Sequence, residues 1–325
     1  MTIEELIIYI SKTALTRKWH WFGYHLKKYI AGKKTNFSSA LISALLNIDK
    51  YIVGYAKTQI DRMASINGRE KYLPDYEQLM QICGEIYVIN QVVNYFQENA
   101  AYELEPHLAE SRKNPELNVS LQKIVIGLEV KVPSLLKYQA SRPDFGIQIM
   151  ARHDGLLDIE TFSKEQVLLP RDNPVKDFLD LANQKFALFK KNAPNYVSIL
   201  YILWDDFIQE PISALLTKPH GLFRENSFAK DKDNNILKFE NVDYIFLDRF
   251  ITNFQRDVAE CPLLDGKGNF LQYGSSRNLP IPFMINPFTH PLQNEEIIEC
   301  LQGVPIDDCL GAEYEPLDFI FFMKN

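Results

Sequence analysis

A continuous apolar run at residues 196–204, YVSILYILW, constrains the fold more than any other segment of the sequence. The run has the length of a strand, is rich in β-branched and aromatic residues and contains no charged side chain. A strand that is apolar on both sides is typical of a central sheet whose two faces are both covered. The sequence therefore predicts an α/β protein with residues 196–204 as a buried central strand.

Helical and strand-like segments surround this run. Apolar residues recur at helical spacing over residues 76–97, and again over 174–191, where Pro174 stands in the first turn and Asn173 is a candidate cap. Four further segments read as strands: residues 101–108, 117–122, 124–132 and 242–247. Together these segments predict a mixed central sheet flanked by helices, preceded by a helical N-terminal region.

The chain has 325 residues, enough for about two domains. Its 46% hydrophobic and 24% charged residues exclude a disordered, collagen-like or coiled-coil protein. We expect a helical region at 1–75, a core at 76–255 and an irregular extension at 256–325 that packs on the core. No apolar run reaches membrane-spanning length, and Glu4 and Glu5 stand where a secretory signal would be basic, so we expect a cytoplasmic protein without membrane partners.

The charges are distributed unevenly along the chain. Residues 6–48 contain seven Lys and Arg residues and no Asp or Glu, so the rest of the chain carries −14 against a net charge of −7. A basic stretch of this kind indicates contact with nucleic-acid phosphates, and the residues expected to bind DNA are Arg17, Lys18, Lys27 and Lys28. The aromatic residues among them, Trp19, Trp21 and Tyr24, either stack on bases or belong to the core.

Residues 114–133, NPELNVSLQKIVIGLEVKVP, contain the pattern that indicates chemistry. Strand side chains alternate, so Glu129 and Lys131 lie on one face, where Gly127 is expected to leave open space beside the carboxylate. A carboxylate beside an ammonium group at the end of a core strand can bind a metal and orient a water molecule. Glu116 on the neighbouring strand would complete a Mg²⁺ site, with Glu85 on the preceding helix as an outer carboxylate.

These residues resemble the PD-(D/E)xK nuclease superfamily, whose core is a helix, three mostly antiparallel strands, a second helix and a further strand. Residues 76–205 follow that order, with Glu85 on the first helix, Pro115-Glu116 opening the second strand and Glu129-Val130-Lys131 ending the third. This sequence has Glu116 where the family usually has aspartate. The resemblance implies a restriction-endonuclease-like fold, with residues 76–255 as a nuclease-like core.

The resemblance also implies an activity. It predicts a Mg²⁺-dependent DNA endonuclease of restriction or defence type, with Mn²⁺ as an alternative cation, and a homodimer is a further expectation. Glu116, Glu129 and the backbone carbonyl of Val130 would hold the metal, while Lys131 orients the nucleophile. Gln184 and Lys185, on the second helix, match a position where the family often places polar residues near the scissile phosphate.

Other interpretations remain open. About one ExK triplet is expected by chance in a chain of this length, so Glu129 and Lys131 could form a solvated strand face of an unrelated enzyme. A nuclease-fold protein without activity, serving as a binding or structural subunit, is the main alternative. Asp144, with Asp158 and Glu160, forms a rival motif. Cys300 and Cys309 with a histidine could bind zinc, although the four cysteines are better explained as reduced, buried thiols.

Overall fold

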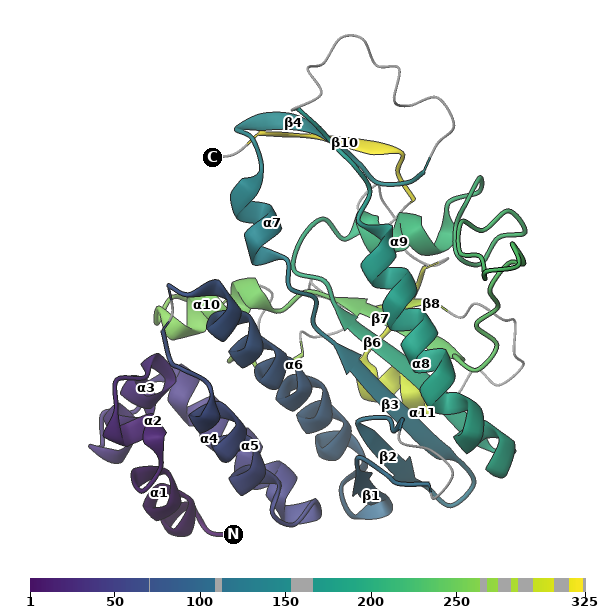
Figure 1. The fold of residues 1–325 in the computed structure, drawn as a ribbon. Helices are drawn as coiled ribbons and strands as arrows, with labels where there is room; N and C mark the ends of the chain where they lie inside the picture. The colour runs from purple at the N-terminus through teal and green to yellow at the C-terminus, as the bar shows by residue number, and fades with distance from the viewer. Residues whose placement is uncertain are drawn as a thin grey trace.

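The computed structural model describes residues 1–69, 71–108, 113–152, 166–263, 268–273, 282–285, 295–306 and 316–323. It is a mixed α/β structure in which helices flank both faces of a mixed central sheet (Figure 1). The fold class expected from the apolar run at residues 196–204 is confirmed at this level.

The N-terminal region is helical, as its apolar periodicity predicts. Capping boxes fix two of its helix starts, Thr2 with Glu5 and Thr35 with Ser38, because each pair satisfies backbone N–H groups that lack partners in the first turn. The helices are α1 Ile3–Ser11, α2 Ala14–Arg17, α3 Trp21–Ile30, α4 Asn36–Tyr51 and α5 Tyr55–Ser65. Their buried side chains share one core with the next helix.

That helix, α6 Leu73–Phe96, is buried along most of its length. It lies between the N-terminal helices and the central sheet, so apolar side chains are needed on more than one of its sides (Figure 1). Pro74 stands in its first turn, where a missing N–H costs nothing, and the helix therefore begins before the predicted residue 76. Through α6 the N-terminal region is packed against the sheet.

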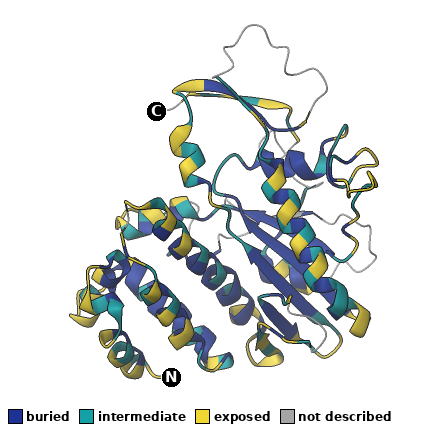
Figure 2. Ribbon diagram, viewed as in Figure 1, coloured by how far each residue is buried: buried dark blue, intermediate teal, exposed yellow. Residues whose placement is uncertain are grey.

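The central sheet has the strand order β1-β2-β3-β6-β7-β8-β9. β1, β2 and β3 are antiparallel, β3, β6 and β7 are parallel, and β8 is antiparallel to β7. Every residue of β6 is buried, as its sequence predicts (Figure 2). The bounds are β1 Ala101–Leu104, β2 Leu117–Ser120, β3 Val125–Lys131, β6 Tyr196–Leu203, β7 Tyr244–Asp248, β8 Phe283–Ile285 and β9 Val304–Pro305.

The two faces of the sheet pack against different helices. Ile126, Leu128 and Val130 of β3 belong to the core shared with α6. The alternate residues of β3 and β6 face α8 Asp172–Asn192, whose buried Leu179 and Phe186 pack with Leu200 and Ile202. Because strand side chains alternate, Glu129 lies on the α8 side of the sheet.

Helix α8 starts two residues before the predicted Pro174. Asn173 lies inside the first turn, so the prediction that it caps the helix is wrong; Arg171 occupies the N-cap position. The carboxylate of Asp172, in the first turn, accepts a hydrogen bond from Arg152 Nε at 2.6 Å. A negative charge at this end of a helix is favoured by the helix dipole.

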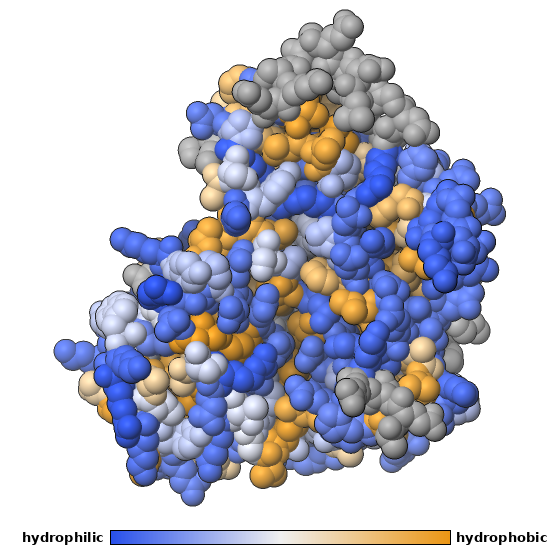
Figure 3. All heavy atoms as spheres, in the orientation of Figure 1, coloured by the Kyte–Doolittle hydropathy of each residue, from blue (hydrophilic) through white to orange (hydrophobic). Residues whose placement is uncertain are grey.

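A smaller sheet, with the order β10-β4-β5, stands beyond α7 Leu136–Ser141 (Figure 1). Its strands are β4 Phe145–Ile149, β5 Val167–Leu168 and β10 Phe319–Met323. Figure 3 shows apolar side chains gathered at this end of an otherwise mostly hydrophilic face. Exposed side chains on these strands include Phe145, Phe319 and Met323.

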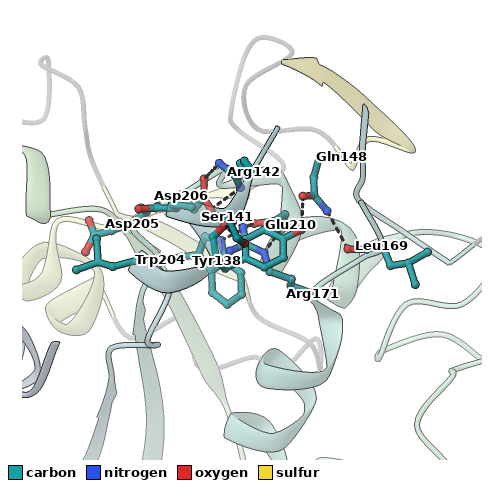
Figure 4. A network of polar contacts seen from close by, with 12 residues as sticks. Tyr138, Ser141, Arg142, Gln148, Leu169, Arg171, Trp204, Asp205, Asp206 and Glu210 are labelled. Carbon is teal, nitrogen blue, oxygen red and sulfur yellow. Dashed lines mark hydrogen bonds and ion pairs between the residues drawn. The ribbon is translucent and has the colours of Figure 1, made fainter. Parts of the chain in front are cut away.

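Buried charges join this part of the molecule to the central sheet (Figure 4). Arg171 forms ion pairs with Asp206 and Glu210, and Arg142 forms a second ion pair with Asp206 at 2.5 Å. Glu210, on α9 Gln209–Leu216, also accepts a hydrogen bond from Trp204 Nε1 at 3.1 Å, directly after β6. Burial raises the pKa of Glu210, and Arg171 opposes that effect.

The described parts of residues 256–325 contribute to both sheets. β8 and β9 extend the central sheet, and β10 pairs with β4. α11 Glu295–Leu301 packs along α6, where Gln91 Nε2 donates to the carbonyl of Cys300 at 2.8 Å. The remaining helix, α10 Ile251–Val258, follows β7. Across the described residues we find no helix with the length and apolarity needed to cross a membrane.

Candidate active site

Glu129 is the centre of the candidate site. Its side chain is 0% exposed, so the interpretation of a solvated strand face is wrong for this residue. Oε1 accepts a hydrogen bond from Lys185 Nζ, on α8, at 2.6 Å and forms an ion pair with Lys131 Nζ at 2.5 Å. Oε2 is buried and, within the described residues, has no hydrogen-bond partner. A buried carboxylate oxygen without a partner is costly, which points to a ligand at that position.

Gly127 does not leave open space beside Glu129, contrary to our expectation. A Cβ atom at Gly127 would lie 1.9 Å from the hydroxyl oxygen of Tyr196. That hydroxyl donates to Asn118 Oδ1 at 2.7 Å, across the strand from Gly127. The glycine therefore makes room for the Tyr196 ring, which closes one side of the Glu129 environment.

Glu116 directly precedes β2, beside the last β2–β3 pair, Leu117 with Leu128. Its N–H donates to the Leu128 carbonyl at 3.0 Å, so Glu116 meets β3 at Leu128, directly before Glu129. Burial, followed by the charges of Glu129 and Glu85, raises the pKa of Glu116 to about 7. Lys185 and Lys131 oppose that rise.

Glu85 lies on α6, on the other side of the sheet from α8. Its carboxylate is held by the guanidinium of Arg62, from α5, at 2.5 Å for Nη1–Oε2 and 3.0 Å for Nη2–Oε1. Because its charge acts on Glu116, Glu85 belongs to the outer part of the same electrostatic cluster. Glu116 is thus the residue that connects the α6 side with the α8 side.

Sequence reasoning missed two members of this cluster. Arg62 lies 23 positions before Glu85, and Tyr55, at the start of α5, is fully buried, with a hydroxyl that lacks a hydrogen-bond partner among the described residues. The charges of Glu85, Arg62 and Glu116 all act on Tyr55, whose pKa is raised chiefly by burial. Nothing in the sequence around α5 marks these residues, because only the packing of α5 on α6 places them here.

The cluster contains three carboxylates, from Glu85, Glu116 and Glu129, and three cations, from Arg62, Lys131 and Lys185. Among the described residues, no three His, Cys, Asp or Glu side chains are grouped as a ready metal site. Mg²⁺ needs less than that, because it binds through one or two carboxylates and keeps several waters. The unpartnered Oε2 of Glu129 and the nearby Glu116 fit that requirement, with the Val130 carbonyl next in the chain.

The residues predicted to bind DNA are distributed over two regions. Arg17, Lys18 and Lys27 are exposed in the N-terminal region, and Lys28 is half-buried beside Tyr24. On α8, Lys185 contacts Glu129. Gln184 is exposed, and its amide instead contacts Lys113 and Asp180.

The aromatic residues of the basic stretch divide into two groups. Trp21 packs against Tyr76 and Phe254, with ring centroids 5.5 and 5.8 Å away, and therefore belongs to the core. Trp19 and Tyr24 are instead 66% and 44% exposed.

The rival sites are only partly described. Asp144 is exposed immediately before β4, while Asp158 and Glu160 lie outside the described residues. For the zinc alternative, Cys300 is buried and its pKa is raised by burial, and Cys309 lies outside the described residues. Cys261 is exposed, so the expectation that the thiols are buried is wrong for that residue.

Comparisons with known proteins add no assignment. No protein-family model, curated protein or solved structure matches this chain.

Proposed function

We propose that this protein is a metal-dependent DNA endonuclease with a restriction-endonuclease-like core. The observation that carries the proposal is the environment of Glu129: a fully buried carboxylate with two lysines at Oε1, no partner for Oε2 within the described residues, and the Glu116 carboxylate near enough to feel its charge. Phosphodiester hydrolysis needs these components, namely oxygen ligands for a divalent cation and a positive group beside the nucleophile.

The order of the elements supports the same proposal. A helix (α6), three antiparallel strands (β1, β2 and β3), a second helix (α8) and a strand parallel to the third (β6) occur in this order along the chain, with α7, β4 and β5 between β3 and α8. This is the order that the sequence resemblance to PD-(D/E)xK nucleases implies. The side chains expected to act come from α6, the residue directly before β2, the end of β3 and α8, as that resemblance implies.

Each residue has a separate task in the proposed mechanism. Glu116, Glu129 and the Val130 carbonyl would hold Mg²⁺ or Mn²⁺, which supplies a more acidic bound water and positive charge at the scissile phosphate. Lys185 and Lys131 hold Oε1 of Glu129, which would leave Oε2 to bind the cation. Lys131, which is 20% exposed, orients the attacking water. Glu116 must lose its proton to act as a ligand.

The alternative, a nuclease-fold subunit that binds without cleaving, also has an observation in its favour. Two ammonium groups already neutralise Glu129, and Arg62 neutralises Glu85. These ion pairs can serve a structural role without a metal, holding α5 against α6 and β3 against α8.

Nicking of supercoiled plasmid with Mg²⁺, Mn²⁺ or EDTA tests the proposal. We expect metal-dependent cleavage by the wild type, none by Glu129→Gln or Glu116→Ala, and partial activity for Glu116→Asp, which restores the usual residue of the family. Glu98→Gln is the matched control, because Glu98 is an exposed carboxylate paired with Lys50 at 2.7 Å. Cleavage that survives Glu129→Gln would reject this site. If the wild type cleaves DNA with neither Mg²⁺ nor Mn²⁺ while Glu116→Asp does cleave it, the binding alternative is established.

A further inference from the structure

The surface around the junction of α2 and α3 carries two exposed aromatic rings. Trp19 is 66% and Tyr24 44% exposed, although large aromatic side chains usually contribute to cores. We call the surface formed by Trp19, Tyr24 and the neighbouring cations Arg17, Lys18, Lys27 and Lys28 the aromatic-basic face.

Local packing holds these rings outward. The buried His20 caps α3, where its Nδ1 accepts from the Gly23 N–H at 3.3 Å. Gly23 lies so close to α2 that a Cβ atom there would be 1.6 Å from the carbonyl oxygen of Leu15. Because Phe22 and Leu26 of α3 face the core, helical spacing turns Tyr24 to the outside. The exposed rings therefore stand on a fixed framework.

The two rings form a small platform with a cation at its edge. Their centroids are 6.3 Å apart at an interplanar angle of 46°, and the ammonium of Lys28 lies 4.8 Å from the centre of the Tyr24 ring. Residues 6–48 carry seven basic side chains and no carboxylate, and the carboxylates of Asp75 and Glu260, from other elements, act on the buried His20 and His25. The face thus combines flat apolar surface with positive charge.

This combination matches one class of ligand. A phosphate backbone satisfies the cations, and a base can stack on an exposed ring, as in proteins that bind single strands. In duplex DNA the bases are already stacked inside the helix, so exposed rings would gain little there. We infer that the aromatic-basic face binds unpaired bases of a single-stranded nucleic acid, which, resting on the proposed function, makes the substrate a nucleic acid with a single-stranded segment.

Binding without metal tests the inference separately from cleavage. Fluorescence anisotropy of the full chain in EDTA would compare labelled oligo(dT), an abasic oligomer of the same length and a duplex. We expect oligo(dT) to bind roughly tenfold more tightly than the abasic oligomer, which has the same phosphates but no bases. Trp19→Ala and Tyr24→Ala should each reduce that preference, Trp19→Phe should retain it, and Phe145→Ala, at an exposed ring on the small sheet, should leave it unchanged.

Tryptophan emission gives a second measurement. Trp19 is the exposed indole, whereas Trp204 is fully buried and Trp21 packs in the core, so oligo(dT) should quench wild-type emission but not that of Trp19→Phe. Equal affinity for oligo(dT) and the abasic oligomer would overturn the inference. So would unchanged preference in both alanine variants, or binding to anionic lipid vesicles without binding to oligo(dT). Base-dependent binding by a wild type that cleaves nothing would keep this inference and reject the nuclease proposal.

Discussion

The ammonium of Lys185 lies 2.6 Å from Oε1 of Glu129, which joins the middle of α8 to the end of β3 across 56 positions in the sequence. Lys131 approaches the same oxygen from two residues along the strand. One buried carboxylate oxygen therefore holds two cations, and both lose their partner if its charge is removed. This relationship governs both the chemistry and the stability of the candidate site.

We expect Glu129→Gln to destabilise the fold by roughly 2 kcal/mol, because it leaves two largely buried ammonium groups with a neutral partner. Replacing Lys185 by methionine as well should recover part of the loss, since only one cation then remains. Urea unfolding of both single variants and the double variant measures the coupling. Additive losses would show that Lys185 and Glu129 do not depend on each other.

Divalent cations should stabilise the wild type. A ligand that binds only the folded state at 100 times its dissociation constant adds about 2.7 kcal/mol to the free energy of unfolding. We expect Mg²⁺ to raise the melting temperature of the wild type and of Glu98→Gln, EDTA to reverse the rise, and Glu116→Ala to abolish it. A rise of equal size in Glu116→Ala would place the cation elsewhere.

The contacts of this site that follow from strand geometry could be predicted from the sequence. The contacts that depend on tertiary packing could not. Glu129 and Lys131 share a face because strand side chains alternate, and Glu116 comes near Glu129 because β2 and β3 are adjacent antiparallel strands. Arg62 has no such local rule, because its contact with Glu85 depends on how α5 packs on α6. Gly127 was misjudged for the same reason: the ring that fills its space, Tyr196, comes from a strand 69 positions later.

Arg62→Gln should have two opposite effects. It removes the guanidinium that pairs with Glu85, a largely buried carboxylate, so we expect a loss of roughly 1 kcal/mol in folding stability. If Glu85 is an outer carboxylate of the metal site, its freed charge should at the same time tighten Mg²⁺ binding. Isothermal titration and urea unfolding distinguish the two effects. Arg69→Gln, which breaks an Arg–Asp pair whose arginine is more exposed, is the control and should leave Mg²⁺ affinity unchanged.

The buried pair of Arg171 and Glu210 should be structural. Their side chains are 9% and 1% exposed. Removing Arg171 leaves Glu210 as a buried carboxylate without its cation, at a cost of about 3 to 5 kcal/mol, whereas removing Glu210 leaves Arg171 paired with Asp206 and should cost less. The double variant Arg171→Met with Glu210→Leu should cost less than either single change, because apolar groups need no partner. Thermal unfolding of the three variants tests this, and a double variant less stable than both single variants would contradict it.

Asp205 should make stability depend on pH. Its Oδ1 accepts from the N–H groups of Phe250 and Ile251, at 2.7 and 2.8 Å, where α10 begins. Burial, which outweighs these two bonds, raises the pKa of Asp205 from 3.8 to about 7. Between those values the folded protein holds a proton that the unfolded chain has released, so stability falls as the pH rises toward 7.

Asp205→Asn keeps an oxygen that can accept from both backbone groups but carries no charge at any pH. The stability of Asp205→Asn relative to the wild type should therefore be greater at pH 8 than at pH 5, by roughly 2 to 3 kcal/mol. Urea unfolding of both proteins at the two pH values measures the difference, and Asp144→Asn, at an exposed position, controls for the general effect of removing a charge. If the free energy of unfolding of Asp205→Asn relative to the wild type were instead greater at pH 5, the pKa of Asp205 would be lowered by its backbone hydrogen bonds rather than raised by burial.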